Sequence, residues 1–270
     1  MATVQNLKKK LKAVRSTQKL SKAMKTAASV KYSRLNERFR GFFDYNNECQ
    51  ALKEFFSKDV ASLFRLKEHA PTLFLVLSSN KGLCGNFNSE LLSFAAQQLQ
   101  NNNNYTAVVM GKKALSFFAD KKIPFVKALE MDDAPSFERA EQILSFLREF
   151  SEQNEICDIK IIYPNYKNMM IQKPKVQSLI FGEQISQDNL PMFFPDKQTA
   201  QKALAQKIAV NFLYGCLLET ALGAQAATLM TMRSAYDTAG EYCAKLEREL
   251  NHLRQSRVTA DVIETAVQTE

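Results

Sequence analysis

The loop Gly82-Leu83-Cys84-Gly85 is the first stretch whose residue types could support chemistry. It follows the apolar run Thr72–Leu77, so it should lie between a strand and a helix, where backbone N–H groups can bind phosphate. It contains neither GxxxxGK[ST] nor GxGxxG. We therefore expect a turn that needs positive φ rather than a nucleotide site. Cys84 has no histidine near it in the sequence, so we expect no nucleophile.

Other residues that could ligate metals or transfer protons are scattered. The five cysteines are widely spaced and include no CxxC, and they are Cys49, Cys84, Cys157, Cys216 and Cys243. This pattern favours reduced thiols over a zinc site or a disulfide framework. The two histidines, His69 and His252, are far apart, and Asp132-Asp133 is expected to be solvated surface. The sequence predicts no catalytic constellation, no cofactor and no metal.

Positive charge is concentrated at the N-terminus. Residues 1–40 contain twelve basic residues and a single acid, Glu37, which gives +11; because the whole chain carries +8, the rest nets about −3. Such an arm attracts nucleic acid, an anionic membrane or an acidic protein surface. Composition leaves a nucleic-acid-binding helix and a protein-facing helix equally open.

A long helix is predicted at each end of the chain, and the N-terminal one carries this positive charge. Near the C-terminus, steps of four and three connect mostly apolar residues into a heptad seam of about five repeats: Leu218, Leu222, Gln225, Leu229, Met232, Tyr236, Ala239, Cys243, Leu246, Leu250 and Leu253. A long helix in an ordinary bundle is the alternative. Near the N-terminus, residues 3–57 show a thinner stripe, with Thr3 as N-cap: Val4, Leu7, Leu11 and Val14, then after a slip Leu20, Met24 and Ala27, then Leu35, Phe39 and Phe42. We expect these two helices to pair antiparallel.

Between the helices, strand and helix patterns alternate. Strands are predicted at 72–77, 105–110, 123–127, 156–163 and 175–181, and helices at 89–99, 112–121 and 136–151. Alternation of this kind indicates a mostly parallel sheet. The predicted fold is a long antiparallel coiled coil of the terminal helices, residues 1–65 and 196–270, with an inserted Rossmann-like α/β domain at 66–195. No secretory signal or membrane span is expected.

Three stretches resemble the signatures of the γ subunits of F-type ATP synthases, in the same order and at comparable spacing. The first is Thr17–Lys25, followed by Ala27-Ala28-Ser29 and Lys31. The second is Gly82-Leu83-Cys84-Gly85 with Asn88, and the third is Asp237–Glu241 with Asn251 and Arg254–Thr259. The resemblance covers essentially the whole chain and implies a central rotary shaft with no catalytic site of its own.

The resemblance also implies partners and contact residues. The partners are the α and β subunits of the catalytic ring, the ε subunit and the membrane c-subunit ring, on the cytoplasmic face of the cell membrane, with no nucleic acid and no small-molecule substrate. The residues implied to contact the catalytic ring are Met24, Arg254, Gln255 and Thr259, followed by Lys22 and Lys25; Gly82, Leu83, Cys84 and Gly85 are implied to form a structural turn. A basic coiled-coil protein that binds nucleic acid is the alternative.

The chain departs from the family pattern at several positions. Ala224 and Thr228 replace an acid and an arginine, and Asn80 and Lys81 replace an acid and an arginine in the central loop. The end, residues 264–270, lacks the small, glycine-containing apolar tail. These departures affect the expected details of the contact with the catalytic ring and of coupling, and they do not affect the resemblance to the family.

Overall fold

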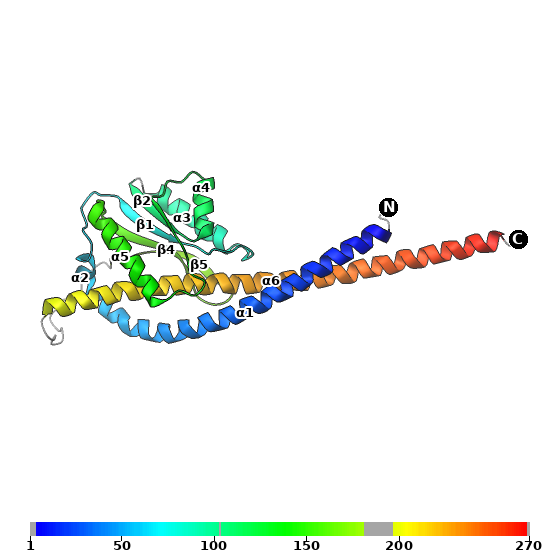
Figure 1. Cartoon of the computed structure of the whole chain (residues 1–270), viewed down its shortest axis with the longest axis horizontal. Helices are drawn as coiled ribbons and strands as arrows, with labels where there is room; N and C mark the ends of the chain where they lie inside the picture. The colour runs from blue at the N-terminus through cyan, green and yellow to red at the C-terminus, as the bar shows by residue number, and fades with distance from the viewer. Residues whose placement is uncertain (1–3, 103, 181–196, 269–270) are drawn as a thin grey trace. The chain divides into compact units, whose positions relative to one another are not determined.

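The computed structural model describes residues 4–102, 104–180 and 197–268. The chain divides into two compact units, one made of residues 1–29 and 228–270 and the other of residues 30–227. Its elements, labelled in Figure 1, are α1 (Val4–Phe55), α2 (Ser57–Ala61), β1 (Thr72–Leu77), α3 (Phe87–Gln100), β2 (Tyr105–Met110), α4 (Lys112–Asp120), β3 (Lys127–Leu129), α5 (Phe137–Gln153), β4 (Asp158–Tyr166), β5 (Gln172–Ser178) and α6 (Lys197–Gln268).

The second unit, residues 30–227, is built on a five-stranded sheet in the order β3-β2-β1-β4-β5. β1 pairs in parallel with β2 and with β4, β2 pairs in parallel with β3, and only β5 runs antiparallel, against β4. The mostly parallel α/β domain predicted between the terminal helices is confirmed. All six residues of β1 are buried, because helices cover both faces of a central parallel strand.

Alternate residues of β1 reach two different cores. Leu73, Leu75 and Leu77 pack with α5 and with the part of α6 in this unit, whereas Phe74 and Val76 pack with α3 and α4. This alternation follows from the period of two along a strand. α6 of the second unit is therefore part of the domain core.

The third predicted strand was misplaced. β3 is Lys127–Leu129, where Val108 pairs with Lys127, and not 123–127. The Ile123 N–H donates instead to the Phe118 carbonyl, and the Phe125 ring lies edge-on to Phe118. These apolar side chains close the α3–α4 side of the core, which periodicity could not distinguish from a buried strand. β4 and β5 are also shifted along the chain, and Phe181 lies outside the described residues.

In the first unit, residues 1–29 and 228–270, the two helix ends pair antiparallel, as predicted. Leu7 and Leu11 of α1 form an apolar cluster with Cys243 and Leu246 of α6. Arg15 lies further along α1 and donates a 2.6 Å hydrogen bond to Glu247. In Figure 1 the blue start of α1 and the orange-to-red end of α6 run in opposite directions.

The predicted slip in the α1 stripe is wrong. Leu20 is 60% exposed and Ala27 is exposed, whereas Ser21 and Ala28 are 5% and 4% exposed. The 3-4 spacing therefore continues without interruption from Leu11 through polar and small residues. Apolar character was the wrong guide here, because a seam position can be filled by a small side chain where two helices approach closely. The N-cap expected at Thr3 lies outside the described residues.

Candidate functional site: the surface of the helical pair

A basic groove runs along the first unit. Its volume is about 680 Å³, and it is lined by Lys8, Leu11, Lys12, Arg15, Ser16, Lys19, Glu247, Leu250 and Asn251. Glu247 is the acid of this lining, and the Arg15 guanidinium already pairs with it. The remaining lysines give the groove a positive field, so it suits an acidic partner.

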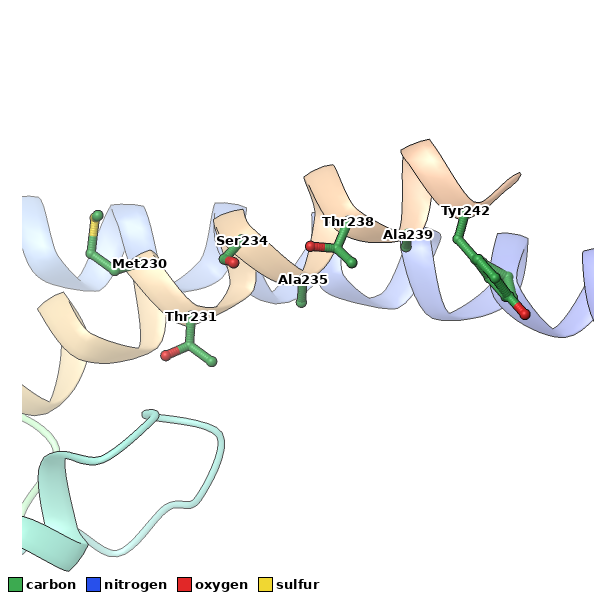
Figure 2. Close-up of a pocket in the computed structure, with 8 residues that line it drawn as sticks. Met230, Thr231, Ser234, Ala235, Thr238, Ala239 and Tyr242 are labelled. Atoms are coloured by element: carbon green, nitrogen blue, oxygen red, sulfur yellow. The ribbon is translucent and has the colours of Figure 1, made fainter. Parts of the chain in front are cut away.

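The first unit has a second, apolar groove, which Figure 2 shows. It also measures about 680 Å³ and is lined by Val14, Met230, Thr231, Ser234, Ala235, Thr238, Ala239 and Tyr242. Most of these side chains are small and stand on one face of α6 (Figure 2). Such a face admits the close approach of another backbone or side chain.

The predicted contact residues on α1 lie in the last turns of α1 that belong to the first unit. Lys22 is exposed, and Met24 and Lys25 are half-buried. The Lys25 ammonium lies 4.9 Å from the centroid of the Tyr236 ring of α6, in range of a cation–π interaction. Lys25 therefore has a partner within its own chain, whereas Lys22 faces solvent.

The predicted contact residues on α6 lie elsewhere. Arg254, Gln255 and Thr259 are exposed, and the Thr259 hydroxyl donates to the Gln255 carbonyl at 2.9 Å. Gln255 follows Tyr236 by nineteen residues, which is roughly 28 Å along a helix. The structure thus does not bring the two groups of predicted residues together.

The last described turns of α6 lack cover by this chain. From Asn251 to Ile263, every residue whose burial is described is exposed. Val258, Val262 and Ile263 are 55%, 62% and 59% exposed. A run of exposed apolar side chains on a regular helix is what a protein-binding surface presents.

The Gly82–Gly85 loop joins β1 to α3 in the second unit. Positive φ occurs at Gly85 (56°) and at Leu83 (62°), and Leu83 is exposed while Cys84 is buried. The Asn88 amide of α3 holds the loop, donating to the Ser79 hydroxyl at 2.9 Å, the Lys81 carbonyl at 3.2 Å and the Cys84 sulfur at 3.0 Å. The polar groups named here are hydrogen-bonded to one another, so the loop has the geometry of a structural turn held by Asn88.

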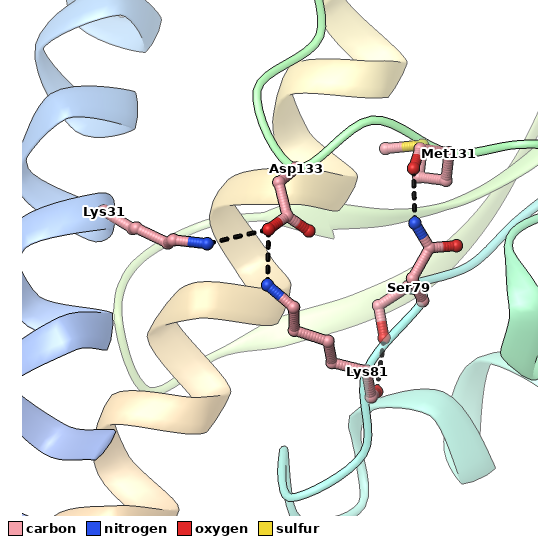
Figure 3. Close-up of polar contacts among 6 residues, drawn as sticks. Lys31, Ser79, Lys81, Met131 and Asp133 are labelled. Carbon is pink, nitrogen blue, oxygen red and sulfur yellow. Dashed lines mark hydrogen bonds and ion pairs between the residues drawn. The ribbon is translucent and has the colours of Figure 1, made fainter. Parts of the chain in front are cut away.

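The loop is also tied to α1 through an acid (Figure 3). Asp133 accepts a 2.7 Å hydrogen bond from Lys31 and another from Lys81. These bonds, that from Lys31 first, hold the pKa of Asp133 below its usual range. Asp133 is exposed at the surface, as expected, with 41% of its side chain accessible, and it also pairs with these two lysines.

Two departures from the family pattern take part in local contacts. Asn80 donates to the Met131 carbonyl and accepts the Lys112 N–H at 3.1 Å. Ala224 of α6 is buried against Cys84 and Phe87. The described residues contain no cluster of three or more His, Cys, Asp or Glu that could hold a metal, and no helix that could cross a membrane.

Sequence reasoning missed Glu219. It is the sole charged residue between Lys207 and Arg233, and that isolation in an apolar helix was the available signal. Its carboxylate accepts the Tyr166 N–H at 2.7 Å and the Asn165 side-chain amide at 3.3 Å. Burial raises the pKa of Glu219 to about 7.

Comparison with known proteins places this arrangement in a family. A model of the ATP synthase family matches residues 3–266. The ATP synthase gamma chain of Exiguobacterium sp. is 26% identical over 277 residues, covering 98% of this chain and 97% of that protein, and that of Symbiobacterium thermophilum is 26% identical, covering 96% and 94%. Among solved structures, a chain of the Euglena gracilis mitochondrial ATP synthase (OSCP/F1/c-ring) is similar with a TM-score of 0.73 at 17% identity, over 98% of this chain and 93% of that one. This chain belongs to the γ-chain family of ATP synthases.

Proposed function

We propose that this γ chain is the rotating shaft that couples ion flow across a membrane to ATP synthesis or hydrolysis. In this proposal the paired helix ends of the first unit stand inside the ring of α and β subunits. The second unit meets the ε subunit and the c-subunit ring on the cytoplasmic face of the membrane. ATP chemistry belongs to the β subunits, and this chain acts on them through its surface.

The observation that carries the proposal is the uncovered end of α6. A regular helix that exposes Val258, Val262 and Ile263 lacks the burial that stabilises most protein helices, so we expect another protein to cover it. The proposed ring contacts Arg254, Gln255 and Thr259 belong to the same turns. In this proposal that cover is the catalytic ring, and the family membership supports it.

The two grooves of the first unit support the same proposal. The basic groove suits acidic loops of a surrounding collar, and the apolar groove of Figure 2 differs from it in chemistry. A shaft with unlike faces makes different contacts with each surrounding site as it turns. Such differential contacts shift each site between conformations. Met24, Lys22 and Lys25 are proposed to contribute near the apolar groove.

The test is reconstitution of the full chain with its α, β and ε subunits and with the membrane part that carries the c-subunit ring. We expect co-assembly and ATP hydrolysis that drives ion pumping in membrane vesicles. The double variant Arg254→Ala with Gln255→Ala should lower coupled turnover severalfold, whereas Lys245→Ala, an exposed basic residue on the same helix, should not. A chain that never enters the complex, or equal activity of both variants, would contradict the proposal.

Nucleic-acid binding is the second candidate, favoured by the basic groove. It predicts an affinity for DNA or RNA that falls steeply with salt. A gel-shift titration that shows no complex at low salt removes this candidate.

A further inference from the structure

A buried acid joins α6 to the sheet of the second unit. Glu219 stands on α6, and its carboxylate accepts the backbone N–H of Tyr166, the last residue of β4. A buried carboxylate costs free energy unless polar groups solvate it, so its position depends on these donors. Asn165, the preceding residue of β4, supplies the second.

Tyr166 extends this contact to α1. Its hydroxyl lies 2.7 Å from the Tyr32 hydroxyl of α1, and its ring packs edge-on against Phe39, also of α1, at 5.7 Å between centroids. One residue at the end of β4 is therefore held by α6 through its backbone and by α1 through its side chain. Both helices continue beyond this unit and form the helical pair.

The charged and titratable groups around Glu219 come from four elements. The positive charge of Lys175, in β5, attracts the Glu219 carboxylate. Burial raises the pKa of Tyr166, and the charge of Arg40, in α1, acts electrostatically to lower it. Tyr163 of β4 donates to Gln177 at 3.1 Å, and Cys216 of α6 is buried beside that tyrosine. None of the described contacts places a cation in direct hydrogen bond with Glu219, so the Tyr166 N–H and the Asn165 amide are its main partners.

We propose that Glu219 is a positioning residue of the shaft: it fixes the end of β4 to α6 and, through Tyr166, to α1, so that the sheet and the parts of both helices in this unit turn together. The turning rests on the proposed function. The attachment itself does not, because it is a property of the isolated chain.

The experiment compares Glu219→Ala, which removes the acceptor, with Glu219→Gln, which keeps an acceptor oxygen. Hydrogen exchange of the Tyr166 amide is measured in the full chain, with Tyr163→Phe as a control for loss of a neighbouring buried hydrogen bond. We expect Glu219→Ala to lower the protection of this amide about tenfold or more. Glu219→Gln should restore it to within about threefold of the wild type, and Tyr163→Phe should retain it. Wild-type protection in Glu219→Ala, or failure of Gln to restore it, would overturn the attachment.

A second measurement uses the assembled complex. The ratio of ion pumping to ATP hydrolysis should fall severalfold with Glu219→Ala and recover with Glu219→Gln. If Glu219→Ala does not fold, Tyr166→Phe removes only the hydroxyl link to α1 and should lower the same ratio, whereas Tyr163→Phe should not. Unchanged coupling in a complex whose Tyr166 amide has lost protection would refute the role in turning. A chain that never assembles would instead contradict the proposed function and leave the exchange result standing.

Discussion

Replacing Glu219 by Gln removes a titrating group from the junction of α6 and β4 while keeping an oxygen for the Tyr166 N–H. Burial raises the pKa of Glu219 in the folded chain from 4.5 to about 7. The folded chain therefore holds this proton more tightly than the unfolded chain. The stability that the protonated group contributes is fully present below about pH 4.5 and is lost as pH rises through about 7.

The magnitude follows from the two pKa values. The difference between 4.5 and about 7 corresponds to about 3 kcal/mol of unfolding free energy, of which about 2 kcal/mol is lost between roughly pH 5.5 and roughly pH 8.5. The variant has no group at this position to titrate. Its own offset in stability does not change with pH, so the slope of the difference between the two proteins isolates Glu219.

The assay is thermal or urea unfolding of both full chains at several pH values. The wild type should lose about 2 kcal/mol relative to Glu219→Gln across that range, which is about 4–8 °C in Tm for a unit of this size. Tyr163→Phe, which alters a neighbouring buried residue but keeps Glu219, should retain the wild-type pH dependence. Parallel pH profiles for wild type and Glu219→Gln would refute the reasoning.

Five further substitutions, of which Leu20→Ala and Gly41→Ala are controls, test the fold. Leu246→Ala, in the buried seam cluster, should lower the free energy of unfolding by about 2–5 kcal/mol. Leu20→Ala, at an exposed position, should change it by less than about 0.5 kcal/mol. Thermal melts of the two variants followed by circular dichroism measure this difference. Gly111→Ala should strongly destabilise the unit that contains the sheet, because φ at Gly111 is 94° and a Cβ there would lie 2.3 Å from the Ser78 carbonyl oxygen. At Gly41 a Cβ would meet nothing within 4 Å, so Gly41→Ala should stabilise the helix by up to about 1 kcal/mol. Asp133→Asn removes a half-exposed ion-pair acceptor, so its cost should stay below about 1 kcal/mol and shrink further at high salt, as urea unfolding at two salt concentrations can establish.

Much of the fold could be predicted because buried helices and strands place apolar residues at regular intervals along the sequence. β1 and β2 begin where the sequence predicted, and the Ser136 hydroxyl caps α5 by accepting the Arg139 N–H at 3.2 Å. β3 could not be placed, since Ile123 and Phe125 are as apolar as strand residues but close a core. The boundaries at residues 65 and 195 stay predictions.

The candidate site was less predictable, because its key contacts join distant residues. Lys31 lies in α1, Lys81 in the loop after β1 and Asp133 in the loop after β3, and no local pattern relates them. Glu219 meets Tyr166 across fifty-three positions. The ring contacts at Met24, Arg254, Gln255 and Thr259 stay predictions, since their partners belong to other chains.

The polar middle of the α1 stripe shows how two helices can pair without a continuous apolar seam. A Cβ at Gly240 would lie 3.0 Å from the Gln18 side-chain nitrogen, so the glycine allows Gln18 to lie against α6. Ser21 is buried with little apolar surface of its own, so hydrophobic burial contributes little here. The leucine cluster near the start of α1 must then supply most of the pairing free energy. Leu246→Ala should therefore separate the helix ends more than Ser21→Ala, and the pairing depends in its middle on close fit rather than on apolar area.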